Sequence, residues 1–149
     1  MRLESPYKRS IPDQVVGYVP GGWDMFHVGH LNILRQARAH CDILMVGVVS
    51  DEALFDMKGR HPVISLEERL EIVGAIGIVD KVIVDFSRDK TLVWNAHHFD
   101  ILFKGDDWKN TPKGMQLEFN MASVGVRVHY FPYTQSTSST MLREALSIR

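Results

Sequence analysis

Short apolar runs alternate with amphipathic segments along most of the chain. The apolar runs predict strands at about residues 15–19, 43–49, 82–84, 101–104 and 126–131. The segments between them carry apolar residues at helical spacing or begin at capping residues, and they predict helices at about 28–40, 51–57, 66–77, 91–98, 115–122 and 138–148. The run at 43–49 is almost continuously apolar, which is typical of a strand buried on both faces.

The alternation of strands and helices with short connections predicts one α/β domain. Its expected architecture is a doubly wound, five-stranded parallel sheet with helices on both faces. Residues 1–13 are polar and include Pro6 and Pro12, so we expect a flexible N-terminal arm before a domain at 14–149. Ligands of such folds bind beyond the carboxyl ends of the strands, so the loops at that edge are the first place to look for chemistry.

Composition narrows the class of protein. The 149 residues include 17 Lys and Arg against 18 Asp and Glu, a net charge of −1. That balance argues against a surface that coats nucleic acid or an anionic membrane. Cys41 is the one cysteine, which excludes an intrachain disulfide. No apolar run approaches the ~20 residues of a membrane span, and no apolar stretch of a secretory signal follows the start, so we expect a cytoplasmic protein.

The loop after the first predicted strand combines glycines with two histidines. Gly21 and Gly22 permit a tight turn and close approach of a ligand to the backbone. His27 and His30 project to one side at the start of a predicted helix, whose free N–H groups favour anions. Gly29 between them leaves room for a phosphate. Surface or capping histidines, or a metal pair, are the alternatives, although zinc would need a third ligand that the sequence does not clearly offer.

This loop resembles the HxGH signature of the nucleotidyltransferase superfamily, and the stretch from Gly21 to His30 resembles its cytidylyltransferase branch. The likeness runs from about Gly17 to the C-terminus and is nearest to the glycerol-3-phosphate cytidylyltransferases, with the ethanolamine-phosphate enzymes also close. It implies a Rossmann-like fold and transfer of CMP from CTP to a small phosphorylated alcohol, with release of pyrophosphate. It further implies Mg²⁺ bound with the triphosphate, no dedicated protein metal site, and a homodimer.

The resemblance also assigns roles to residues of the first loops. It makes His27 and His30 contacts of the α- and β-phosphates, and makes Lys58 and Arg60 the cations that neutralise the leaving pyrophosphate. An exposed, solvated loop is the alternative for the last two residues. The nucleotide is expected to contact a further set from this part of the chain, namely Gly21, Gly22, Trp23, Asp24, Gly29 and Arg69. For Arg69 the alternative is a surface ion pair of small energetic value.

Residues Gly105, Asp106, Asp107 and Trp108 form a segment that resembles the GDDW of glycerol-3-phosphate cytidylyltransferases. Placed after the fourth strand, it would offer an aromatic ring for base stacking and a carboxylate for an amino or hydroxyl group of the nucleotide. An Asp-rich turn whose tryptophan covers the core is the alternative.

The stretch before the last helix departs from the family, because Tyr133 stands where relatives carry arginine and Gln135 where they carry an acidic residue. Hydroxyl groups remain to hold phosphate or to cap the helix, at Thr134, Ser138, Ser139 and Thr140. The missing cation would then come from elsewhere, with the candidates being Lys104, Lys109, Lys113 and Arg127.

Three other functions stay open from the sequence. An adenylyltransferase of the same superfamily would act on a sugar phosphate, a flavin or a pantetheine. A nucleotide-binding regulatory module without catalysis is favoured by Tyr133, and a metal-dependent hydrolase would use His27 and His30.

Overall fold

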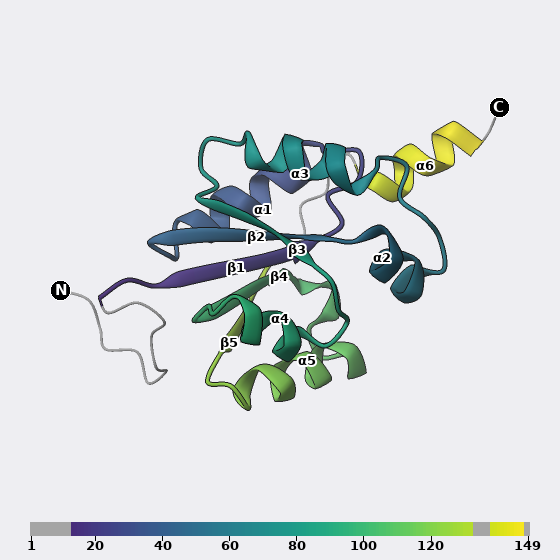
Figure 1. Cartoon of the computed structure of the whole chain (residues 1–149). Helices are drawn as coiled ribbons and strands as arrows, with labels where there is room; N and C mark the ends of the chain where they lie inside the picture. Colours follow the sequence, from purple (N-terminus) through teal and green to yellow (C-terminus); the bar gives the residue numbers. More distant parts are fainter. Residues whose placement is uncertain (1–12, 133–137, 148–149) are drawn as a thin grey trace.

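A parallel five-stranded sheet forms the centre of the computed structural model, which describes residues 13–132 and 138–147 (Figure 1). The strands lie in the order β3-β2-β1-β4-β5, and every pair of neighbours is parallel. Their bounds are β1 Val16–Gly21, β2 Ile43–Val49, β3 Lys81–Asp85, β4 Ile101–Gly105 and β5 Arg127–Phe131. The predicted fold class, a single Rossmann-like α/β domain, is confirmed.

The described chain also contains six α-helices and one 3₁₀ turn, and all but the last helix lie between strands. Their bounds are α1 Val28–Arg38, α2 Asp51–Lys58, α3 Leu66–Gly74, α4 Lys90–Ala96, the 3₁₀ turn η1 Asp106–Trp108, α5 Pro112–Ala122 and α6 Ser139–Ser147. Every predicted helix is present, but α1 and α3 end before the predicted positions 40 and 77 because their last turns close at Ala39 and Ala75. No described helix has the length and apolar character that crossing a membrane requires.

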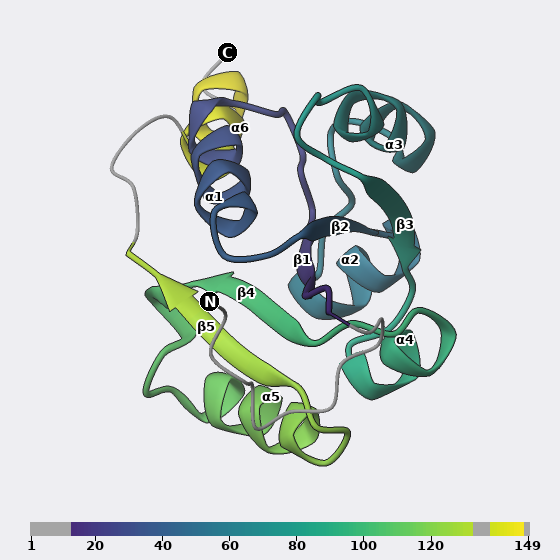
Figure 2. The ribbon, with the colours of Figure 1, turned by 90° about the vertical axis from the view of Figure 1, so that its left-hand side faces the viewer.

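The helices cover both faces of the sheet, as the end-on view in Figure 2 shows. On one face, Leu34 of α1 and Val73 of α3 pack into a core with Val19 and Val46. On the other face, helices α4 and α5 contribute to a second core that includes Tyr18. Successive residues of β1 therefore point into different cores, so both faces of this central strand are buried, as the apolar runs predict.

The strand order reverses between β1 and β4, since the chain passes from β1 through α1 to one side and from β4 through α5 to the other. In doubly wound sheets this switch point is where ligands bind. The two strands pair only at Gly17↔Ile101 and Tyr18↔Leu102, although both continue for several residues. Because the two strands are parallel, the loop that follows β1 and the turn that follows β4 leave the sheet at the same edge.

Candidate active site

His27 and His30 cap the N-terminus of α1 through hydrogen bonds to nearby backbone N–H groups. His27 is the N-cap, and its Nδ1 accepts the Gly29 N–H at 3.1 Å. The Nδ1 of His30 accepts the His27 N–H at 3.2 Å, and the two ring centroids lie 3.9 Å apart. Because each Nδ1 is an acceptor, a neutral ring carries its proton on Nε2. Capping and phosphate binding are therefore compatible, since capping occupies one nitrogen of each ring and leaves an N–H donor on the other.

The protein keeps both rings uncharged at neutral pH. Burial lowers the pKa of His27, and it lowers the pKa of His30 to about 3, with the neighbouring His27 acting in the same direction. Trp23 packs edge-on to His30 at 5.3 Å between centroids, is 5% exposed, and donates its Nε1–H to the Gly47 carbonyl. Trp23 therefore supports His30 from the core, and its expected contact with the nucleotide stays a prediction.

The loop that holds the histidines is conformationally strained. Trp23 and Met25 both adopt the left-handed region, with φ of 56° and 50°, which side chains other than glycine rarely occupy. Such backbone persists only where surrounding contacts hold it, and it occurs frequently at ligand sites.

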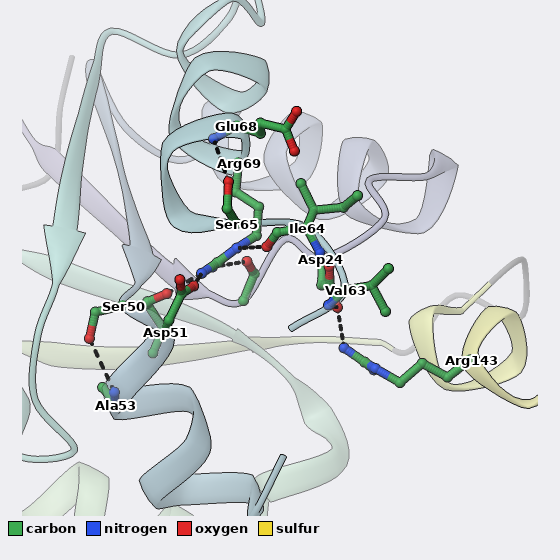
Figure 3. Close-up of polar contacts among 12 residues, drawn as sticks. Asp24, Ser50, Asp51, Ala53, Val63, Ile64, Ser65, Glu68, Arg69 and Arg143 are labelled. Carbon is green, nitrogen blue, oxygen red and sulfur yellow. Dashed lines mark hydrogen bonds and ion pairs between the residues drawn. The ribbon is translucent and has the colours of Figure 1, made fainter. Parts of the chain in front are cut away.

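Asp24 supplies much of that support (Figure 3). Its carboxylate is 3% exposed and accepts the Val63 and Ile64 N–H groups, each at 2.8 Å. It also forms an ion pair with Arg143 of α6, while the Asp24 carbonyl accepts the Ser139 hydroxyl at 2.6 Å. Asp24 thus joins α6 and the α2–α3 connection to the histidine loop.

Arg69 is a second structural clamp, and its interpretation as a surface ion pair is wrong. Its side chain is fully buried, and Nη1 donates to the Gly22 and Val49 carbonyls, each at 2.7 Å. Nε donates to the Ile64 carbonyl at 2.9 Å, and Nη2 pairs with Asp51 at 2.6 Å (Figure 3). These bonds fix the loops after β1 and β2, so the buried Arg69 side chain shapes the site from within the protein.

Lys58 and Arg60 follow from the end of α2, where Gly59 adopts φ of 70° and ends the helix. Both residues are exposed, as the loop alternative predicts. Partial burial of its amine nevertheless lowers the pKa of Lys58, with Arg60 and Arg143 adding to the effect and Asp107 opposing it. Lys58 also acts on the pKa of His30. Its ammonium therefore lies within electrostatic reach of the histidines and of the end of β4.

The segment Gly105–Trp108 ends β4 and turns through η1 into α5. Asp106 and Asp107 are exposed, whereas Trp108 is half-buried against the second core, so the alternative that it covers the core is correct. The ring also carries a cation, because Lys104 Nζ lies 3.8 Å from its centroid. Lys113 Nζ of α5 lies 5.8 Å from the same centroid.

The cations that could replace the missing arginine lie at different ends of the sheet. Lys104 and Lys113 lie beside Trp108 at the carboxyl end of β4. Arg127 opens β5 opposite Ile101, the first residue of β4, and so lies at the other edge of the sheet. Arg143 was missed altogether: nothing local marks a helical arginine as the partner of an aspartate 119 positions away.

The hydroxyls at the start of α6 are also used by the protein. Ser138 Oγ accepts the Met141 N–H at 3.0 Å, as a capping residue does, and Ser139 bonds Asp24. Thr140 is exposed. Tyr133 and Thr134 lie outside the described residues. Within the part of the chain that the structure describes, no group of three or more His, Cys, Asp or Glu residues is placed to hold a metal ion.

Comparisons of the sequence with known proteins identify the family of the chain. A sequence model of cytidylyltransferase-like proteins matches residues 18–145. An ethanolamine-phosphate cytidylyltransferase of Arabidopsis thaliana is 39% identical over 128 residues, which are 83% of this chain and 30% of that protein. The bifunctional protein HldE of Koribacter versatilis is 32% identical over 145 residues, 97% of this chain and 29% of that protein. The chain thus spans about 30% of the length of these curated relatives.

Solved structures show the same fold. The lipopolysaccharide core biosynthesis protein from Thermoplasma volcanium has a TM-score of 0.70 at 22% identity, covering 83% of this chain and 99% of that one. A pantoate-beta-alanine ligase from Francisella tularensis has a TM-score of 0.62 at 15% identity, covering 93% of this chain and 71% of that one.

Proposed function

The chain belongs to the cytidylyltransferase-like family, and from this premise we propose that it transfers CMP from CTP to the phosphate of a small alcohol, releasing pyrophosphate. The observation that carries the proposal is the pair of neutral imidazoles at the N-terminus of α1, each with Nδ1 engaged by backbone and Nε2–H left as a donor. Relatives named ethanolamine-phosphate cytidylyltransferase support a phosphorylated small alcohol as acceptor, with glycerol 3-phosphate as a close analogue.

The reaction that this site suits needs no protein nucleophile. A phosphate oxygen of the acceptor forms a bond to the α-phosphorus of CTP, and the bond from that phosphorus to the bridging oxygen of the β-phosphate breaks. Pyrophosphate leaves with the electron pair of that bond. The protein contributes positioning and stabilisation of the negative charge that builds on the phosphates.

Each part of the site has a proposed role in that transfer. His27 and His30 donate hydrogen bonds to the α- and β-phosphates, with the free N–H groups of α1 behind them. Lys58 and Arg60 neutralise the leaving pyrophosphate. Arg69 and Asp24 hold the loops in place from the protein side.

Mg²⁺ is proposed as part of the substrate, bound to the triphosphate oxygens, where it neutralises charge. Asp24 does not fit as its resident ligand, because its carboxylate already accepts two N–H groups and pairs with Arg143. A homodimer is proposed from the family resemblance alone, and analytical ultracentrifugation of the purified chain tests it. A cytoplasmic location stays a proposal that rests on the sequence features given above.

Pyrophosphate release tests the proposed reaction. The purified chain is incubated with each nucleoside triphosphate and with glycerol 3-phosphate, ethanolamine phosphate and a sugar phosphate. We expect turnover with CTP and a small alcohol phosphate, and its loss in His27→Ala. Turnover with ATP but not CTP would replace the proposal by the adenylyltransferase alternative. Binding of CTP without turnover on any acceptor would favour the regulatory module.

A further inference from the structure

Lys104 lies near the end of β4, at the switch point of the sheet, on the face opposite the one that α1 covers. It lies two residues beyond Leu102, the last residue of β4 that pairs with β1. Leu102 faces the core formed with α4 and α5, and alternation along a strand places Lys104 on that same face. His27 and His30 belong to α1, which covers the other face. The carboxyl edge of the sheet therefore lies between the histidines and Lys104.

The charges around Lys104 come from four different elements. Lys58 at the end of α2, Lys90 of α4 and Lys113 of α5 act on it as cations, and Asp107 of η1 is the carboxylate that opposes them. Lys90 is already neutralised, because its Nζ lies 2.6 Å from the buried Asp85 carboxylate. Within residues 13–132 and 138–147 no carboxylate forms an ion pair with Lys104.

An amine in this position is poorly matched by the protein alone. Burial is the largest cause that lowers the pKa of Lys104, to about 8; Asp107 opposes the shift, and Lys90, Lys58 and Lys113 add to it. The face of Trp108, 3.8 Å away, offers a cation–π contact but no negative charge. A dianion placed beside Lys104 would supply the missing counter-charge.

We propose that Lys104 binds the phosphate of the alcohol phosphate acceptor, with Lys113 beside it at Trp108, and that Lys104 sets the affinity for this substrate. The inference rests on the proposed transfer reaction. In an in-line displacement the attacking and leaving oxygens lie on opposite sides of the α-phosphorus. The triphosphate has its donors on the α1 side, so a separate set of cations across the sheet edge suits the attacking phosphate. Lys58 acts electrostatically on both His30 and Lys104, so the two sets belong to one site.

Steady-state kinetics of three variants test this assignment. Lys104→Met should raise the acceptor KM roughly 10- to 100-fold, the range expected for a charge-assisted hydrogen bond, and should leave the nucleotide KM within about twofold. Lys104→Arg keeps the charge and should restore most of the affinity. Lys81→Met, an exposed lysine at the amino end of β3, is the matched control and should match wild type. An unchanged acceptor KM, or a rise in the nucleotide KM instead, would overturn the proposal.

The pH profile separates a binding role from a structural one. The ammonium form of Lys104 is lost as the pH rises through about 8, so kcat/KM for the acceptor should fall above that pH. Lys104→Arg should move this alkaline limb to higher pH, because arginine stays protonated. Lys58 also has a lowered pKa, so a limb that stays in place in Lys104→Arg would assign the titration elsewhere and contradict the proposal.

Calorimetric binding distinguishes failure of this inference from failure of the proposed reaction. Ethanolamine phosphate and glycerol 3-phosphate are titrated into wild type, Lys104→Met and Lys104→Arg at pH 7 and 9.5, with and without a nonhydrolysable CTP analogue. Lys104-dependent binding without turnover on any nucleotide would refute the reaction and retain the inference. Turnover by wild type together with equal binding by Lys104→Met would refute the inference alone. Absence of binding of either acceptor by folded wild type would refute both the inference and the proposed reaction.

Discussion

Arg69→Ala is the substitution whose cost the structure defines most sharply. It removes a fully buried guanidinium that donates to three backbone carbonyls, of Gly22, Val49 and Ile64, and pairs with Asp51. Each acceptor left without its donor costs roughly 1–3 kcal/mol, and water entering the vacated space offsets part of the sum. We expect a loss of about 3–5 kcal/mol, the range for breaking a buried ion pair, out of a total of about 5–15 kcal/mol.

Urea denaturation followed by circular dichroism measures this loss. With a slope of ~1–3 kcal/mol per molar urea, the midpoint should fall by at least about 1 M while the slope stays unchanged. Arg88→Ala is the matched control, because Arg88 also lies near an aspartate, Asp56, and donates to its carbonyl, but is 66% exposed. Its free energy of unfolding should change by no more than about 0.5 kcal/mol. Equal shifts in the two variants would refute the argument that burial decides the difference.

Three further outcomes follow from the described contacts. His27→Ala should lower kcat about 10²–10³-fold in the pyrophosphate-release assay, as loss of one transition-state donor does, with a folded circular dichroism spectrum. Because the pKa of His30 is about 3 in the folded chain against ~6.5 unfolded, the unfolded chain binds more protons between these values. The free energy of unfolding should therefore fall as the pH drops through that window, and urea titrations of His30→Asn should show a shallower fall. Gly47→Ala would place a Cβ 1.8 Å from the Tyr18 hydroxyl oxygen and should lower the free energy of unfolding by at least about 1–3 kcal/mol. Gly77→Ala is the control, because its Cβ meets nothing within 4 Å, and its free energy of unfolding should stay within about 0.5 kcal/mol of wild type.

Local patterns were sufficient to predict the elements of the fold. Strand β2 is a continuous apolar run because both its faces are covered, so its consecutive residues alone predict a buried strand. Helices α2 and α3 begin at Ser50 and Ser65, whose hydroxyls accept N–H groups three residues on, so their starts are set by neighbours in sequence. The HxGH loop is equally local, since each histidine bonds backbone within three residues.

Roles that depend on distant partners could not be predicted in the same way. Arg69 looks like an ordinary polar residue on a helix, and only the approach of α3 to the ends of β1 and β2 turns it inward. Asp24 looks like a substrate ligand until Val63, Ile64 and Arg143 meet its carboxylate. These contacts join residues 20 to 119 positions apart, and no periodicity of the sequence records them.

The electrostatics of the site are compatible with the proposed reaction among phosphates in a chain with a net charge of −1. His27 and His30 are neutral donors at physiological pH, because burial disfavours the imidazolium. Burial lowers the pKa of Lys104 to about 8, so part of its amine is neutral near that pH when no anion is bound. Arg143 and Arg69, which are permanently charged, are committed to Asp24 and Asp51. A site built this way stabilises phosphate charge with aimed hydrogen bonds, and gains its full positive charge only when a phosphate is beside it.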